Sequence, residues 1–160
     1  MCNQKVSYIC ATKRFRVMIR DEFKDKIIEL IKQPRMFIPE QIKDLTDQQL
    51  NKIPPAFNNN IIWNVAHLIW AQQEVCYQRF GLQITVDDNY FSPYKTGTKP
   101  GTIIDENEIM YIKHLLITTT DKLVADLENN VLVIDNAIIG LPLHDWLQAG
   151  YIMALKRLVK

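Results

Sequence analysis

The chain has 160 residues, of which 48% are hydrophobic and 23% are charged, a composition typical of one globular domain. Its net charge of +1 gives no argument for nucleic acid as a partner. No apolar run approaches the roughly 18 to 20 residues that a membrane span requires. We therefore expect a soluble protein that binds neither nucleic acid nor a membrane.

The first 20 residues differ from the rest of the chain, because they carry five basic side chains and no acidic one. We interpret residues 1–20 as a basic extension ahead of a single domain at 21–160. The extension is either solvated or an arm that touches a membrane or a polyanion. Its basic residues follow the short apolar stretch at 6–10 instead of preceding it, which argues against a secretory signal.

The first predicted helix covers residues 21–32, where apolar side chains recur at intervals of three and four positions. Pro34 and Pro39 follow. A proline inside a helix costs about 3 kcal/mol, so we predict a kink or short break over 33–39 before the helix resumes at 40–45. The spacing of Thr46 and Gln49 is that of a capping box and predicts one further short turn.

The second predicted long helix begins after Asn58-Asn59-Asn60, with one asparagine as N-cap, and stops at Gly81. A long connection follows at residues 82–103, marked by turn-forming pairs. Connections of this length are usually functional or are packed by their own side chains. Three aromatic residues of this connection could either pack it or line the mouth of a pocket: Tyr90, Phe91 and Tyr94.

The third predicted helix covers residues 105–128, since Asp105 and Glu108 form a second capping pair. Residues 131–134 are β-branched or aliphatic and lack a convincing partner strand, so we interpret them as an extended linker. The last helix covers 137–160, with its regular part expected to start near Pro142. Four long helices joined in sequence favour an all-α bundle.

The three cysteines, Cys2, Cys10 and Cys76, have no metal-finger spacing. An odd count in a chain without a secretory signal favours a reducing compartment, and we expect the cytoplasm. Cys76 lies in the second predicted helix and reads as a small core residue in preference to a reactive thiol.

Two of the three histidines are candidate metal ligands. His67 lies among apolar residues, where it is either a hydrogen-bonded core residue or a ligand. His144 and Gln148 are four residues apart and therefore share a helix face, so both could converge on one ion with a third ligand from a facing helix. A glutamine amide oxygen binds zinc or nickel less tightly than imidazole does. His114 lies off the apolar stripe of its helix and reads as a solvated surface residue.

Three segments resemble the DinB-like superfamily: PPAFNNNIIWNVAHL at 54–68, YKTGTKP at 94–100 and HDWLQAGYIMALKR at 144–157. Together the similarity covers about residues 21–160. It implies a four-helix bundle with a long connection between the second and third helices. It also implies a divalent metal held by one histidine of the second helix and two histidines, four apart, of the last. The matching positions are His67, His144 and Gln148, and Gln148 departs from the family pattern.

The resemblance implies two alternative functions. Characterised relatives include metal-dependent transferases that act with low-molecular-weight thiols. One hypothesis is therefore a zinc- or nickel-dependent thiol S-transferase or related hydrolase, supported by Asn64 or Glu74 if these do more than pack. The other is a degenerate, metal-free member that binds a small molecule or a partner through the same pocket, as the glutamine suggests. A homodimer is also plausible by resemblance.

Overall fold

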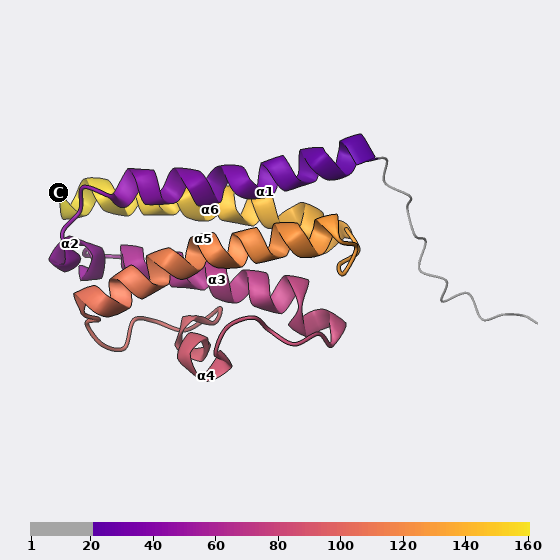
Figure 1. Cartoon of the computed structure of the whole chain (residues 1–160). Helices are drawn as coiled ribbons and strands as arrows, with labels where there is room; N and C mark the ends of the chain where they lie inside the picture. Colours follow the sequence, from indigo (N-terminus) through magenta and orange to yellow (C-terminus); the bar gives the residue numbers. More distant parts are fainter. Residues whose placement is uncertain (1–20) are drawn as a thin grey trace, which may run out of the picture.

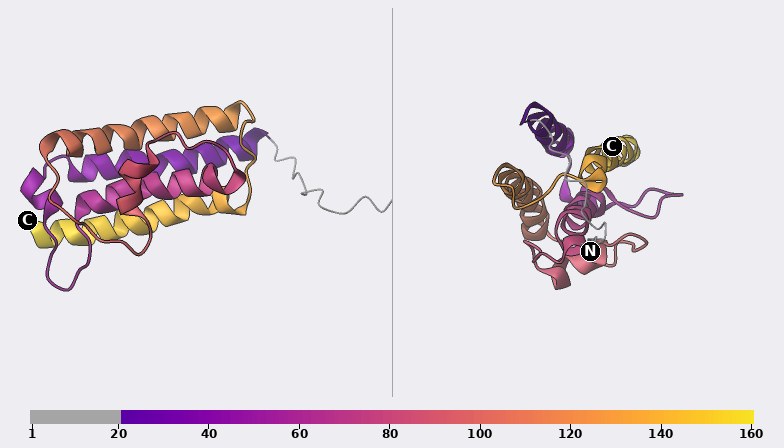
Figure 2. Two further views of the ribbon diagram at one scale, coloured as in Figure 1. Left: turned by 90° about the horizontal axis from the view of Figure 1, so that it is seen from below. Right: turned by 90° about the vertical axis from the view of Figure 1, so that its right-hand side faces the viewer.

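The computed structural model describes residues 21–160, and its architecture is set by four long helices that lie side by side (Figure 1). They are α1 (Asp21–Ile42), α3 (Ile61–Cys76), α5 (Glu106–Glu128) and α6 (Asn136–Val159). Both α1 and α3 pack against α5 and α6, so the four helices surround a shared core (Figure 2). Residues 21–160 contain no strand, which confirms the prediction of an all-α fold.

Short helices occupy the two longer connections. The helix α2 (Asp47–Asn51) lies between α1 and α3. Between α3 and α5 the chain forms the 3-10 helix η1 (Gln78–Phe80), the single turn α4 (Asp88–Phe91) and the 3-10 helix η2 (Ser92–Tyr94). Figure 1 shows this connection running beside α3, which both α4 and η2 contact.

The predicted N-caps are confirmed. Thr46 and Gln49 form the capping box of α2. The Asn60 side chain accepts a hydrogen bond from the Trp63 amide at 2.8 Å, and Asp105 accepts one from the Glu108 amide at 2.9 Å. The prediction that Gly81 ends the second long helix is wrong, because α3 already ends at Cys76. The glycine, at φ 70°, ends the 3-10 turn that follows.

The predicted break over residues 33–39 is wrong, because α1 runs through both Pro34 and Pro39 to Ile42. Ile31, Ile38 and Ile42 are almost completely buried on both sides of the prolines. Burying one such side chain stabilises the fold by about 1.5–3 kcal/mol. Packing along the whole length of the helix therefore offsets the hydrogen bonds that two prolines cannot make.

The last helix lies within one residue of the predicted range 137–160, but the expectation that its regular part starts near Pro142 is wrong. The helix begins at Asn136, and Pro142 lies inside it. The Asp135 side chain accepts hydrogen bonds from the amides of Ala137 and Ile138, both at 3.1 Å. This cap gives a well-defined first turn six residues before the proline, so the proline is not needed to start the helix.

Three further features bear on the predictions: Cys76, the hydrophobicity of the helices, and residues 1–20. Cys76 is completely buried in an apolar cluster, as predicted for a small core residue. None of the helices in residues 21–160 combines the length and the hydrophobicity that a membrane span requires. The basic extension predicted at residues 1–20 lies outside the described residues.

Candidate functional site

The packing of α3 against α6 brings two of the three predicted site residues together. The imidazole centroids of His67 and His144 are 5.4 Å apart, with the rings edge to face. His67 is only 5% exposed, whereas 35% of the His144 side chain is accessible to solvent. His67 is therefore shielded from solvent, whereas solutes can reach His144.

The environment of His67 fixes which of its nitrogens carries the proton. Its Nδ1 lies 2.8 Å from the carbonyl oxygen of Tyr94. A carbonyl can only accept, so Nδ1 donates and Nε2 keeps its lone pair. Burial is the main cause that lowers the pKa of His67, which favours the neutral ring. His67 thus has the tautomer and charge of a metal-ligating histidine.

Two indole rings flank His67 along α3. Trp63, one turn earlier, stacks on the imidazole at a centroid distance of 5.1 Å and an interplanar angle of 9°. Trp70, one turn later, stacks at 5.6 Å and 22°. These contacts restrict the rotation of the ring and keep water from its faces.

A buried carboxylate contacts His144. Asp145 Oδ1 lies 3.3 Å from His144 Nδ1, and Oδ2 accepts a hydrogen bond from Arg35 Nε at 2.7 Å. Both Arg35 and Asp145 are completely buried. Arg35 also donates to the side chain of Gln72 and, at 3.0 Å, to the carbonyl of Leu68. Gln72 in turn donates to the Thr119 carbonyl of α5 at 2.7 Å, so one network connects all four long helices.

Gln148 lies one turn after His144 on α6 and is half-buried. In the described part of the chain it makes no hydrogen bond with either imidazole. Asn64 donates to the Asn60 carbonyl at 2.6 Å, and Glu74 is exposed. Within residues 21–160 neither makes a hydrogen bond with an imidazole. His114 is exposed, as predicted.

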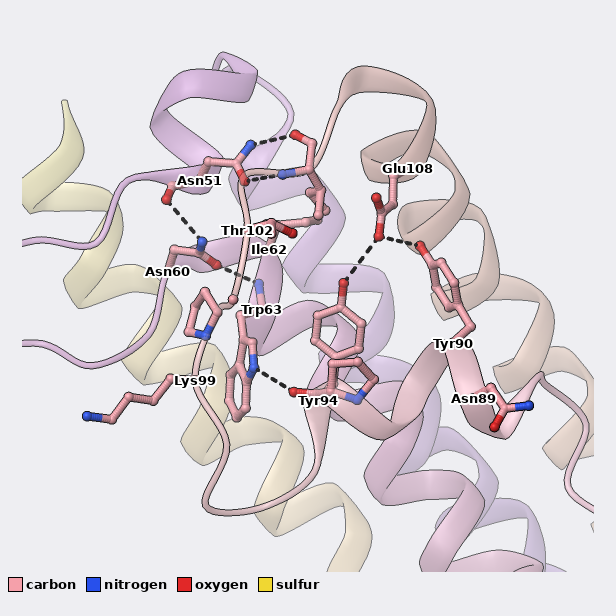
Figure 3. A pocket seen from close by; sticks show the side chains of 14 residues that line it. Asn51, Asn60, Ile62, Trp63, Asn89, Tyr90, Tyr94, Lys99, Thr102 and Glu108 are labelled. Atoms are coloured by element: carbon pink, nitrogen blue, oxygen red, sulfur yellow. Dashed lines mark hydrogen bonds between the residues drawn. The ribbon is translucent and has the colours of Figure 1, made fainter.

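A pocket of about 380 Å³ lies beside this site, between the α3–α5 connection and the first turns of α3 and α5 (Figure 3). Its lining includes Tyr90, Tyr94 and Glu108, but none of the three predicted metal ligands. Trp63 lines the pocket as well and stacks on His67, so its indole ring separates the two.

The aromatic residues of the α3–α5 connection both pack in the core and line the pocket. Phe91 and Tyr94 are buried in the core, while Tyr90 and Tyr94 also line the pocket. Trp63 Nε1 donates to the carbonyl of Pro93 at 3.3 Å, next to the Tyr94 carbonyl that holds His67. The connection is therefore anchored on α3 at the site itself.

Comparison with known proteins identifies the family. The model of the DinB superfamily matches residues 31–150, most of the chain and all three predicted ligand positions. The chain belongs to the DinB superfamily. No curated protein and no solved structure matches it.

Three side chains of the candidate site could donate to a metal ion. Among residues 21–160 no group of three or more His, Cys, Asp or Glu side chains could hold an ion. The available donors are the imidazoles of His67 and His144 and the amide oxygen of Gln148. The two imidazoles are strong donors for a divalent ion, whereas the amide oxygen is a weak one, and no hydrogen bond within residues 21–160 ties it to either ring.

Arg35 and Asp145 were not identified from the sequence as neighbours of the candidate site. One signal was present for Arg35, since it lies on the same helical stripe as Ile31, Ile38 and Ile42, where a solvated arginine is not expected. Asp145 carried no comparable signal, because a carboxylate beside a histidine is unremarkable until both sides of its helix are known.

Proposed function

We propose that this DinB protein is a divalent-metal-dependent enzyme whose four long helices form the four-helix bundle of the family. His67, His144 and Gln148 would hold the ion, zinc or nickel. The observation that carries the proposal is the histidine pair: two imidazoles from facing helices with centroids 5.4 Å apart, one of them held by the Tyr94 carbonyl with Nε2 unprotonated.

Each surrounding group has a distinct part in this proposal. The ion would lower the pKa of a thiol or water at its open position, which suits a thiol S-transferase or a related hydrolase. The Tyr94 carbonyl orients His67, and the Asp145 carboxylate orients His144. The indoles of Trp63 and Trp70 exclude water from the inner ring. A low-molecular-weight thiol is the proposed co-substrate, and the reducing cytoplasm is the proposed compartment.

Elemental analysis of untagged protein tests the proposal. We expect zinc or nickel at less than one ion per chain, because the third ligand is weak. The content should be lost in His67→Ala and raised in Gln148→His, and should not change in the matched control His114→Ala. Metal that is retained only by Gln148→His would rule out the enzyme proposal for the natural chain.

A second candidate function is favoured by the absence of a conventional three-ligand group among residues 21–160. In this alternative the chain is a metal-free member that binds a small molecule or a protein partner. It predicts that the natural chain and His67→Ala contain equally little metal.

We also propose that the protein forms a homodimer. Apolar side chains on α6 support this, since Leu143 and Leu147 are 66% and 68% exposed. Large exposed apolar patches commonly mark protein interfaces.

A further inference from the structure

The pocket beside Trp63 combines aromatic walls with one carboxylate. Trp63, Tyr90 and Tyr94 contribute their rings, and Glu108 contributes its side chain from the first turn of α5 (Figure 3). At about 380 Å³ the pocket lies at the lower end of the range for small-molecule sites, about 300–1,000 Å³. Its size therefore suits a compact ligand.

Both tyrosine hydroxyls are directed at Glu108. Oε1 lies 3.1 Å from the Tyr90 hydroxyl and 3.5 Å from that of Tyr94. Burial, followed by the nearby carboxylate, raises the pKa of Tyr90 and raises that of Tyr94 to about 12. The phenols therefore stay neutral donors. Within residues 21–160 no hydrogen bond reaches the other oxygen, Oε2, which is left for a ligand.

Two asparagines of the pocket lining are engaged within the protein, and its lysine is directed elsewhere. The Asn51 amide nitrogen donates to the Ile104 carbonyl at 2.9 Å, and that of Asn60 donates to the Asn51 carbonyl at 3.0 Å. Lys99, the other charged residue of the lining, is exposed. Figure 3 shows its side chain on the opposite side of the pocket from Glu108, extending away from the tyrosines.

We propose that this pocket binds an organic ammonium ion, with the charged nitrogen beside Glu108 and its alkyl groups against the rings of Trp63, Tyr90 and Tyr94. Aromatic faces attract cations through their quadrupole, and a partly desolvated carboxylate adds a direct ion pair. An anionic ligand would be repelled by the same carboxylate. The proposal does not depend on a metal at the histidine pair.

Choline and its uncharged isostere 3,3-dimethylbutan-1-ol are suitable probes, because they share shape and differ in charge. Isothermal titration of the full chain, in the presence of a chelator, should show millimolar or tighter binding of choline. The isostere should bind at least about tenfold more weakly, as expected when cation–π and ion-pair contacts are lost. Since the metal is removed throughout, failure here leaves the metal proposal untouched.

Two variants identify the responsible carboxylate. Glu108→Gln should weaken choline binding about tenfold or more while leaving the isostere unchanged, because the amide oxygen can still accept from the tyrosines. Glu106→Gln, on the same turn of α5 but exposed and outside the pocket lining, is the matched control and should bind choline normally. Equal binding of the two probes, no binding of choline, or equal losses in both variants would overturn the proposal.

Discussion

Arg35 is a charged side chain that is completely buried in the domain. A guanidinium that is 0% exposed has lost its hydration, which costs several kcal/mol unless the charge and the donors are matched. The Asp145 carboxylate, the Leu68 carbonyl and the Gln72 side chain provide that match. These partners come from α3 and α6, and Arg35 also donates to the Thr120 hydroxyl of α5 at 3.5 Å. The arginine therefore makes the positions of all four long helices depend on one another.

Replacing Arg35 by methionine should therefore destabilise the fold strongly. The apolar stem is kept, but Asp145 is left as a buried charge without its partner, and the expected loss is about 3–5 kcal/mol of unfolding free energy. Urea denaturation measures the loss. The double variant Arg35→Met/Asp145→Leu should recover part of it, because the unpaired charge is then removed.

Lys43→Met is the control, since Lys43 lies just after α1 and is exposed. It should change the unfolding free energy by at most about 0.5 kcal/mol. If Arg35→Met were no more harmful than this control, the buried network would contribute nothing to stability.

Cys76 provides a second prediction for a single residue. Burial raises the pKa of its thiol to about 12, and the side chain is inaccessible. Since the thiolate is the reactive form, a disulfide reagent at pH 8 should not label Cys76 in folded Cys2→Ser/Cys10→Ser protein. Labelling should become rapid in urea. Equal rates in folded and unfolded protein would contradict the burial of this residue.

Among single residues, those connected by local spacing were predictable and those connected by packing were not. His144 and Gln148 were paired by their spacing of four, and the family resemblance alone added His67. The structure brings the two histidines into contact, while the role of all three residues as ligands stays a prediction. The Arg35–Asp145 pair joins residues from opposite ends of the chain. No local pattern encodes such a pairing, because it depends on which helix faces pack together.

At the level of elements, the capping residues that were recognised predicted helix starts correctly, whereas the breaks and starts predicted from prolines were wrong. A cap acts through hydrogen bonds within one turn, so Thr46, Asn60 and Asp105 could be recognised from sequence alone. The effect of a proline depends on how much the helix buries on either side of it. That tertiary term was missing for Pro34 and Pro39 and decided the outcome there. For Pro142 the deciding feature was local, the Asp135 cap, which was not identified from the sequence.

The cap of α5 can be tested directly. Asp105→Ala removes the acceptor for the Glu108 amide and should lower the unfolding free energy by about 1 kcal/mol. Asp105→Asn keeps a good capping oxygen and serves as the control, with less than half that loss expected. Urea denaturation of both variants decides the matter. Equal losses in the two would show that charge near the helix terminus matters and the cap does not.

Considered as a whole, the molecule places two candidate sites on either side of one indole. Trp63 stacks on His67 and also lines the neighbouring pocket. The α3–α5 connection contributes to both, through the Tyr94 carbonyl on one side and the tyrosine rings on the other. The sequence indicated a connection with a functional or packing role, but its position over α3 is set by packing that periodicity does not reveal.

The outer face of α6 carries the last prediction. Five large apolar residues of this helix are exposed: Ile139, Leu143, Trp146, Leu147 and Leu158. Their spacing puts them on one stripe. Gly150 lies on the same stripe. No heavy atom lies within 4 Å of the position that a Cβ atom would take there, so a facing helix could approach closely. A stripe on a single helix can pair with its own copy about a two-fold axis.

We therefore expect a dimer at micromolar concentration in sedimentation velocity, and a monomer for Leu147→Glu, which would place two carboxylates across the two-fold axis. Ile103→Glu is the matched control, because Ile103 is 85% exposed and lies in the α3–α5 connection. It should leave the dimer intact. A natural chain that is monomeric at every concentration, or a dimer that both variants weaken equally, would show that α6 is not the interface.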